Sequence, residues 1–198
     1  MRVLNNELIW AKVKPDAIIP TKRDEDAGYD IYPCFDEDYF IIPSHETKMI
    51  PTGITSAFSE DYVMVLKERG STGTKGIAQR CGVIDSNFRG EWLCPITNVS
   101  SRDLIISKIT IDDLIKKYAK TDEEGDTYIN HEQWRVFLAF CGDDYYDTDL
   151  PIIYPYTKAI CQALLLPVPK MTTKEISYEE LKSIESNRGS GMLGSSGK

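Results

Sequence analysis

The sequence has few of the residues on which many enzyme mechanisms depend. It contains only two histidines, His45 and His131, so a histidine base or a histidine-ligated metal is poorly supplied. Its five cysteines are scattered and include no Cys-x-x-Cys pair, which argues against a zinc site. Their odd number argues against a disulfide framework. Any reaction assigned to this chain must therefore draw on other side chains.

Long apolar runs and an excess of basic charge are missing as well. No stretch approaches the about 18 consecutive apolar residues of a membrane-spanning helix, and the first residues lack the basic-then-apolar layout of a signal peptide. The formal net charge of -8 opposes non-specific binding to nucleic acid. We therefore expect a cytoplasmic protein that has neither a membrane nor nucleic acid as its partner.

Residues 1–100 have the pattern of a β protein. In IIPSHETKMIPTGITSAF, for example, Pro and Gly interrupt β-branched and aromatic residues at short intervals, which predicts short strands. The stretch at 82–98 predicts a hairpin with its turn near Asp85, and Pro95 predicts that the returning strand lies at an edge or has a bulge. The strand pattern resumes at 158–169. Strands and helices do not alternate, which argues against a parallel doubly wound sheet.

Residues 101–155 differ in character. The stretches 109–120 and 130–140 each place apolar residues on one helical face, and an acidic loop joins them. We therefore predict a helical insertion at 101–155. It is either a surface decoration or a docking site for a protein partner, since Trp134 and Phe137 are side chains of the kind that anchor interfaces.

Two stretches partly match known ligand-binding motifs, a calcium loop and a phosphate loop, but each lacks residues that its motif requires. In the acidic loop, Thr127 and Gln133 stand where a calcium loop needs its glycine and its bidentate glutamate. Near the C-terminus, five residues separate Gly191 from Gly197, whereas a phosphate loop has four between its glycines. We predict neither a calcium site nor a phosphate loop of that type.

Four glycine-containing stretches carry charged or hydroxyl side chains: DAGYDIYP, KERGSTGTKG, GVIDSNFRGE and RGSGMLGSSG. Each alone is typical of a turn or a solvated loop. Together they provide Arg69 and Arg188, whose forks match phosphate oxygens, and glycines that let the backbone approach a phosphate closely. Two of their aspartates, Asp30 and Asp85, would serve a divalent cation and a water. This set suits in-line hydrolysis of a phosphoanhydride.

These stretches resemble, in order, the five motifs of the trimeric dUTPase family (dUTP diphosphatases). The first family motif, A-G-x-D-L/I, matches residues 27–31, and the second resembles 69–71. The third, G-V-I-D-x-x-Y-R-G-E, matches 82–91 and is the most specific. The fourth lies around Gln162, and the fifth, R-G-x-G-G-F-G-S-T-G, matches 188–197. The resemblance covers 1–100 and 156–198.

The resemblance implies a fold, an activity and an assembly. The fold would be mainly β, a distorted jelly roll or β-barrel forming one domain over 1–198, with the insertion at 101–155 and a flexible C-terminal lid arm at 186–198. The activity would be Mg2+-dependent hydrolysis of dUTP to dUMP and pyrophosphate. The assembly would be a homotrimer in which three subunits share each site.

The resemblance also implies roles for individual residues. Asp85 would activate the water that attacks the α-phosphorus, and Asp30 would bind magnesium indirectly, through water. The hairpin from Gly82 to Phe88 would receive uracil and deoxyribose, and the fifth motif would close over the γ-phosphate. The substrate-binding residues would be Arg69, Gly70, Ser71, Gln79, Gly82, Ile84, Phe88, Gln162, Arg188, Leu193, Gly194, Ser195 and Ser196.

Three positions depart from the family pattern. Arg69-Gly70-Ser71 stands where Arg-Ser-Gly is usual, Phe88 replaces a tyrosine, and Leu193 replaces an aromatic ring. Two alternative functions stay open. A dCTP deaminase shares the fold, but the base-directed glutamate and the additional arginine that it needs are not visible. A nucleotide-sensing regulatory protein is also compatible with the fold, although the joint presence of Arg69, Asp85 and Arg188 argues against it.

Overall fold

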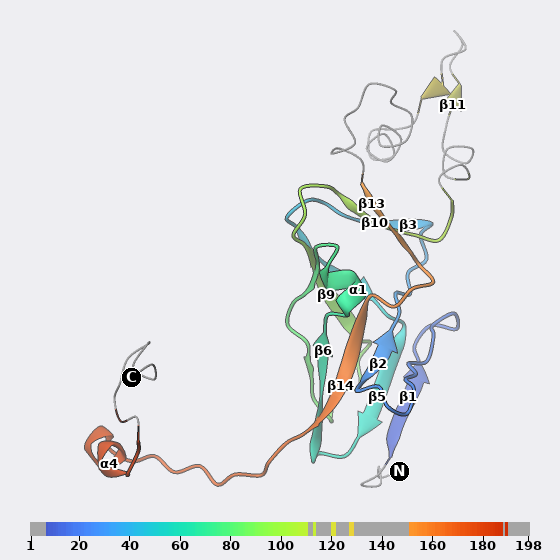
Figure 1. The fold of residues 1–198 in the computed structure, drawn as a ribbon. Coiled ribbons are helices and arrows are strands. Elements are labelled where there is room, and N and C mark those ends of the chain that lie inside the picture. Colours follow the sequence, from blue (N-terminus) through green and yellow to red (C-terminus); the bar gives the residue numbers. More distant parts are fainter. Residues whose placement is uncertain are drawn as a thin grey trace. The chain divides into compact units, whose positions relative to one another are not determined.

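The structure, a computed structural model, describes residues 7–110, 113, 120–121, 127–128, 151–187 and 189. In these residues the protein is mainly β, as predicted (Figure 1). The chain divides into two compact units, Met1–Val168 and Pro169–Lys198. The second unit thus begins well before residue 186, where the lid arm was predicted to start. None of the described helices is both long and apolar enough to cross a membrane.

The largest sheet has four strands in the order β2-β14-β6-β8, all antiparallel to their neighbours. Its strands are β2 (Gly28–Ile31), β14 (Cys161–Pro167), β6 (Tyr62–Lys67) and β8 (Val83–Ile84). Strand β14 lies between β2 and β6, so that Gln162 is paired with Asp30 on one side and with Lys67 on the other (Figure 1). This pairing brings two of the glycine-containing stretches, DAGYDIYP and KERGSTGTKG, to one end of the sheet beside Gln162.

The predicted hairpin at 82–98 is wrong. Its first arm, β8, pairs with β6, whereas its second arm, β9 (Leu93–Asn98), pairs with β4 (Thr47–Pro51) and β7 (Ile77–Gln79). Gly82 accounts for the diversion of β8, because its carbonyl accepts a hydrogen bond from the Leu66 N–H at 2.8 Å. A Cβ atom at Gly82 would lie 2.7 Å from the Leu66 Cβ, so only glycine permits this approach.

Pro95 lies in the central strand of its sheet, not at an edge as predicted. It is opposite Met49, and its carbonyl accepts a hydrogen bond from the Arg80 N–H at 2.9 Å. Strand β7 ends at Gln79, so the N–H that proline lacks would face a position just beyond the end of that strand. The missing donor therefore removes little from the ladder.

The predicted insertion at 101–155 begins and ends with strands that belong to the β body. Strand β10 (Leu104–Ser107) pairs with β3 (Tyr39–Ile42) and, in parallel, with β13 (Ile152–Pro155). Between them, β11 (Lys120–Thr121) and β12 (Thr127–Tyr128) pair across the acidic loop. The stretches predicted as helices lie almost wholly outside the described residues, as do Trp134 and Phe137.

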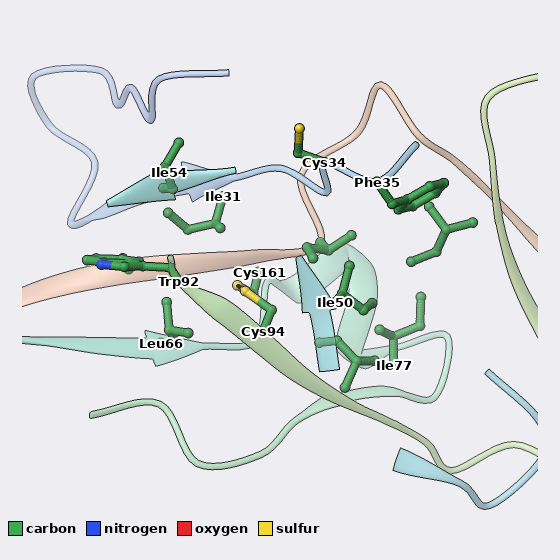
Figure 2. Packing of buried hydrophobic residues seen from close by; sticks show 14 of the residues in the cluster. Ile31, Cys34, Phe35, Ile50, Ile54, Leu66, Ile77, Trp92, Cys94 and Cys161 are labelled. Atoms are coloured by element: carbon green, nitrogen blue, oxygen red, sulfur yellow. Dashed lines mark hydrogen bonds between the residues drawn. The ribbon is translucent and has the colours of Figure 1, made fainter. Parts of the chain in front are cut away.

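Most of the buried hydrophobic residues form one large cluster between the sheets (Figure 2), and a smaller cluster surrounds Ile105. Trp92, Ile31 and Ile54 are buried in it, and Trp10 packs edge-on against Trp92 at 5.0 Å between ring centroids. Strands β1 (Leu8–Lys12) and β5 (Ile54–Phe58) pair antiparallel beside this cluster. The thiols of Cys94 in β9 and Cys161 in β14 lie 3.3 Å apart, where the two sheets meet. Burial of this kind stabilises the scaffold on which the site is built.

The two described helices are short. Helix α1 (Gly70–Gly73) follows β6 directly and carries the second motif. Helix α4 (Tyr178–Ser183) belongs to the C-terminal unit, and a reciprocal capping box between Ser177 and Glu180 defines its start. The hydrogen bonds from the Ser177 backbone N–H and hydroxyl lower the pKa of the Glu180 carboxyl.

Candidate active site

A pocket lies at the end of the four-stranded sheet where β2, β14 and α1 meet. Its volume is about 610 Å³, within the range of about 300–1,000 Å³ that is usual for small-molecule sites. We call it the phosphate pocket. It is lined by Thr21, Lys22, Arg23, Asp26, Ala27, Gly28, Asp30, Arg69, Gly70, Ser71 and Gln162.

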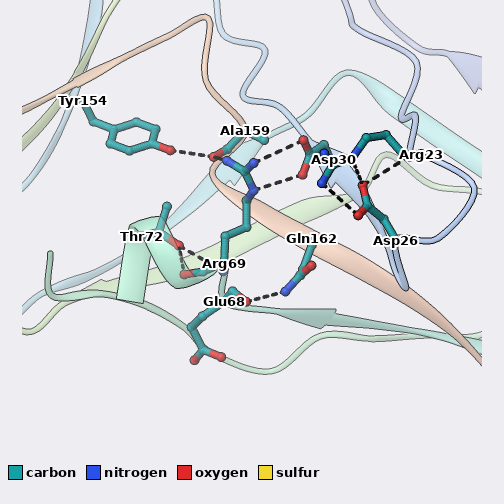
Figure 3. A network of polar contacts seen from close by, with 9 residues as sticks. All are labelled: Arg23, Asp26, Asp30, Glu68, Arg69, Thr72, Tyr154, Ala159 and Gln162. Atoms are coloured by element: carbon teal, nitrogen blue, oxygen red, sulfur yellow. Dashed lines mark hydrogen bonds and ion pairs between the residues drawn. The ribbon is translucent and has the colours of Figure 1, made fainter. Parts of the chain in front are cut away.

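The guanidinium group of Arg69 is held at the wall of the phosphate pocket (Figure 3). Its Nε lies 3.0 Å from Asp30 Oδ1, and its Nη2 donates to Asp30 Oδ2 at 3.3 Å, so arginine and carboxylate meet fork to fork. Its Nη1 donates to the Ala159 carbonyl at 3.3 Å. Three contacts therefore fix the guanidinium at the pocket wall. Both carboxylate oxygens of Asp30, the residue predicted to bind magnesium through water, face Arg69.

The backbone of Arg69 is fixed as well. The Thr72 hydroxyl accepts from the Arg69 N–H at 3.1 Å and donates to the Arg69 carbonyl at 2.9 Å. Thr72 is fully buried, so this contact is shielded from water. It defines the turn from β6 into α1, and with it the place of Gly70 and Ser71 in the pocket wall.

Gln162 is placed by the sheet and by one side-chain bond. Its Nε2 donates to the Glu68 carbonyl at 2.8 Å, which leaves its Oε1 close to β2 (Figure 3). A Cβ atom at Gly28 would lie 2.6 Å from that Oε1. The glycine of the first motif is therefore required for the amide of the fourth motif to enter the pocket.

A second, smaller pocket of about 330 Å³ adjoins the first and shares Asp30, Arg69 and Ser71 with it. One of its walls is Tyr154, whose hydroxyl donates to the Ala159 carbonyl at 2.6 Å. Burial raises the pKa of Tyr154, so this phenol stays protonated and continues to donate. Two donors, from Arg69 and Tyr154, thus converge on one carbonyl.

Asp85 lies outside the phosphate pocket of its own chain. Ile84, the residue before it, is paired with Met64, which is three positions along β6 from Lys67, or about 10 Å at ~3.3 Å per residue. The antiparallel pairing carries Asp85 still farther from Lys67. Beyond it, the Phe88 ring covers Gly90, where a Cβ atom would lie 2.6 Å from the ring. Gly82 and Ile84 lie with Asp85 at the β8 edge of the sheet, which is opposite the β2 edge.

Of the other predicted residues, only Gln79 is among those that the structure describes. Gln79 is in β7, where its Nε2 donates to the Cys81 carbonyl at 2.9 Å, and it does not line the phosphate pocket. Arg188, Leu193, Gly194, Ser195 and Ser196 are outside the described residues. The structure thus brings together Asp30, Arg69, Gly70, Ser71 and Gln162.

Six residues of the pocket wall were not predicted as site residues. Ala27 and Gly28 belong to the first motif, and the other four, Thr21, Lys22, Arg23 and Asp26, precede it. They form the loop before β2, and an acid-rich, base-rich run such as TKRDED is most often a solvated turn. Only one local signal pointed to them, namely their position directly ahead of the first motif. The loop is held beside β2 by a hydrogen bond of 2.9 Å from the Asp30 N–H to the Thr21 carbonyl, and this bond keeps these residues in the pocket wall.

Known proteins resemble this chain in sequence. The dUTPase family model matches residues 14–111. A deoxyuridine 5'-triphosphate nucleotidohydrolase of Leptospira interrogans is 31% identical over 99 residues, which are 48% of this chain and 68% of that protein. A protein of the same name from a Psychrobacter species is 27% identical over 114 residues, 54% of this chain and 73% of that one.

Solved structures show the same fold. A mutant of the Staphylococcus bacteriophage 80alpha dUTPase with dUpNHpp superposes with a TM-score of 0.64 at 19% identity, over 96% of this chain and 98% of that one. The dUTPase from phage phi11 of S. aureus superposes with a TM-score of 0.54 at 19% identity, over 86% and 96%. The expected jelly-roll-like architecture is therefore confirmed. With the identity and coverage of the Leptospira relative, these findings show that the chain belongs to the dUTPase family.

Proposed function

We propose that this protein hydrolyses dUTP to dUMP and pyrophosphate. The observation that carries the proposal is the convergence of Asp30, Arg69, Ser71 and Gln162, from three separate segments, on one pocket of suitable size. Those residues present a cation, a hydroxyl and an amide, which are donors and acceptors suited to a phosphate chain. The relatives named as dUTP nucleotidohydrolases supply the substrate class.

Arg69 would neutralise the phosphate chain without having to reorganise. Its three nitrogens are already held by Asp30 and the Ala159 carbonyl, and each terminal nitrogen keeps one further N–H for a ligand. A donor that is fixed before the substrate arrives stabilises developing negative charge more effectively than a mobile one. The roles of Ser71 and Gln162 are to add neutral hydrogen bonds beside that charge.

Asp85 would activate the attacking water, but from another copy of the chain. Within one chain it lies at the far edge of the sheet from the phosphate pocket. A complete site then needs a second copy to supply the third motif, and Arg188, Ser195 and Ser196 of the fifth motif would close over the γ-phosphate. We propose a homotrimer, which is the assembly that the family resemblance implies, and its closed cyclic symmetry would give every copy the same shared site.

The edge carrying Asp85 would also hold the nucleoside. Gly82, Ile84 and Phe88 form a largely apolar, partly exposed surface, with 42% of Phe88 accessible. An apolar wall against the sugar leaves no room and no partner for a 2′-hydroxyl, so it discriminates against ribose by shape. The same wall would reject the extra methyl group of thymine.

The donor set of the pocket fits magnesium held mainly by the substrate. Among the described residues, no group of three or more His, Cys, Asp or Glu side chains could hold a metal ion. Mg2+ characteristically keeps several waters and is bound by substrate phosphates with one or two carboxylates. Asp30, whose oxygens already face Arg69, would reach such an ion only through water. When bound, the ion supplies charge neutralisation along the triphosphate.

A substrate panel tests the reaction. dUTP, dCTP, dTTP and UTP are each offered with magnesium while pyrophosphate and ammonia are followed. Pyrophosphate from dUTP alone is the expected result. Ammonia from dCTP would instead establish a deaminase, and binding of nucleotides without turnover would establish a sensing protein.

Mixing two inactive variants tests the shared site. Asp85→Asn and Arg69→Gln damage different motifs, so mixed trimers formed after unfolding and refolding together contain some sites with neither change. We expect turnover to reappear in the mixture but in neither variant alone. If both residues acted within one chain, no mixture would recover activity.

A further inference from the structure

The charges around the phosphate pocket do not cancel. Three cationic side chains line it, Lys22, Arg23 and Arg69, together with two carboxylates, Asp26 and Asp30. Formal addition gives +3 − 2 = +1 for these five side chains. Two of the cations are paired: Arg69 with Asp30 at 3.0 Å, and Arg23 with Asp26 at 2.8 Å. The uncompensated charge is therefore that of Lys22.

The contacts of Lys22 leave its charge available. Its Nζ donates to the carbonyls of Arg23 and Asp24 at 3.4 and 3.5 Å, at the long end of hydrogen-bond distances. It also lies 5.6 Å from the centroid of the Tyr29 ring. Neutral carbonyls and an aromatic face hold an ammonium group weakly compared with a phosphate oxygen.

The field of Lys22 already reaches the pocket wall. The charge of Lys22 contributes to lowering the pKa of Asp26, behind the larger effect of the Arg23 hydrogen bond. An anion entering the pocket would meet the same field. Because the groups are partly exposed, salt would weaken the attraction.

The backbone around Lys22 is fixed on both sides. Before it, the Thr21 carbonyl accepts from the Asp30 N–H at 2.9 Å. After it, a turn is closed by the Asp26 N–H, which donates to the Arg23 carbonyl at 3.1 Å, and by the Arg23 N–H, which donates to Asp26 Oδ2 at 3.3 Å. The Cα of Lys22 is therefore fixed beside the pocket, while its four-carbon stem lets the ammonium group move.

We propose that Lys22 is a further substrate-binding residue that contacts the phosphate chain of the nucleoside triphosphate. The inference rests on the proposed function and adds to it a cation from outside the recognised motifs. Asp30 occupies the Nε and Nη2 edge of Arg69 and balances its charge, so Arg69 offers the phosphates only one remaining N–H on each terminal nitrogen. The mobile ammonium group of Lys22 adds to the same pocket a positive charge that no carboxylate of the pocket pairs with. Arg23 is less suited, since Asp26 already balances its charge.

Lys22→Gln tests the proposal, with Lys12→Gln as the matched control. Lys12 is an exposed lysine whose Nζ also bonds to a backbone carbonyl, that of Pro15 at 3.2 Å, but it does not line the pocket. For Lys22→Gln we expect KM for dUTP to rise about tenfold with kcat nearly unchanged, because one charge-assisted hydrogen bond is lost. Lys22→Arg should restore most of the loss, and Lys12→Gln should match the wild type.

Direct binding separates a phosphate contact from a general effect. A non-hydrolysable dUTP analogue should bind about tenfold more weakly to Lys22→Gln, whereas dUMP should bind almost as it does to the wild type. Added salt should weaken analogue binding less in the variant, because one screened charge is gone.

The outcomes for the inference and for the proposed function are distinct. Unchanged KM and unchanged analogue affinity in Lys22→Gln overturn the role of Lys22, even if the wild type hydrolyses dUTP. Equal losses for dUMP and for the analogue overturn it too, since the residue would then support the loop and not the phosphates. A wild type that binds the analogue but does not hydrolyse dUTP overturns the proposed function, while the binding comparison still decides the role of Lys22.

Discussion

The phosphate pocket and the β8 edge both carry family motifs, yet they are constructed in opposite ways. In the pocket, Arg69 and Asp30 are about one-third exposed, and each is held by several hydrogen bonds or ion pairs. At the β8 edge, apolar side chains face outward, with Val83 67% and Phe88 42% exposed. The described hydrogen bonds of that loop are mainly local, such as the one from the Phe88 N–H to the Asp85 carbonyl at 3.1 Å.

The difference indicates which half of the site a single chain can complete. A polar pocket whose charges are paired and oriented is ready to bind before any partner arrives. An exposed apolar edge, in contrast, gains most when another surface covers it. We therefore expect substitutions in the pocket to act on substrate affinity and charge, and substitutions at the edge to act on catalysis and on the strand pairing.

The largest effect is expected at the edge. Asp85→Asn keeps the size of the side chain but removes the base, and general base catalysis contributes about 10²–10⁴-fold. We expect kcat to fall about a thousandfold, measured as pyrophosphate release from dUTP. Binding of a non-hydrolysable dUTP analogue should stay within a few-fold of the wild type. Full turnover in this variant would remove Asp85 from the mechanism.

In the pocket, Asp30→Asn should release the Arg69 fork. The neutral amide cannot accept two charge-assisted hydrogen bonds, so we expect kcat/KM to fall about 30-fold, given ~1.5–3 kcal/mol for a hydrogen bond to a charged group. Asp36→Asn is the control, because Asp36 forms an exposed ion pair with Lys14 at 2.9 Å away from the pocket. Equal activity of the two variants would show that the Asp30–Arg69 pairing does not organise the site.

Gly82→Ala should detach β8 from β6. The added Cβ would lie 2.7 Å from the Leu66 Cβ and 3.1 Å from its carbonyl oxygen, an overpacking that lowers the free energy of unfolding by about 1–3 kcal/mol. Gly70→Ala is the contrast, since no heavy atom lies within 4 Å of its added Cβ. Urea unfolding followed by tryptophan fluorescence measures both. Similar unfolding midpoints would contradict the close approach at Gly82.

The smallest effect concerns the fifth motif, where the family resemblance places an aromatic ring and this chain has Leu193. Leu193→Phe should lower KM for dUTP about threefold, because ring stacking adds about 0.5–1.5 kcal/mol beyond burial. Steady-state kinetics with dUTP measure the change. An unchanged KM would mean that the ring does not stack on the base.

The local sequence pattern was enough to predict the short strands, the return to strand at β14 and the order of the motifs along the chain. It failed where pairing is non-local. The hairpin predicted at 82–98 has the right turn residues, but β8 pairs with β6, which lies earlier in the chain. The prediction that Pro95 lies at an edge was wrong. Its missing N–H would face a position just beyond the end of β7, so a proline is tolerated in this central strand. The insertion was bounded wrongly because β10 and β13 pair in parallel across the stretch between them.

The sequence by itself determined that this chain is a β protein that resembles the dUTPase family, and it predicted Arg69, Ser71 and Gln162 as residues that bind the phosphate chain. Motif order and residue chemistry are local information, so they can be read without coordinates. Only the tertiary structure decided that Asp30 holds Arg69 across 39 positions of sequence, that Asp85 lies beyond the pocket of its own chain, and that Lys22 keeps an unbalanced charge. Ion pairing depends on separations of a few ångströms, and strand pairing sets those separations between residues far apart in the chain.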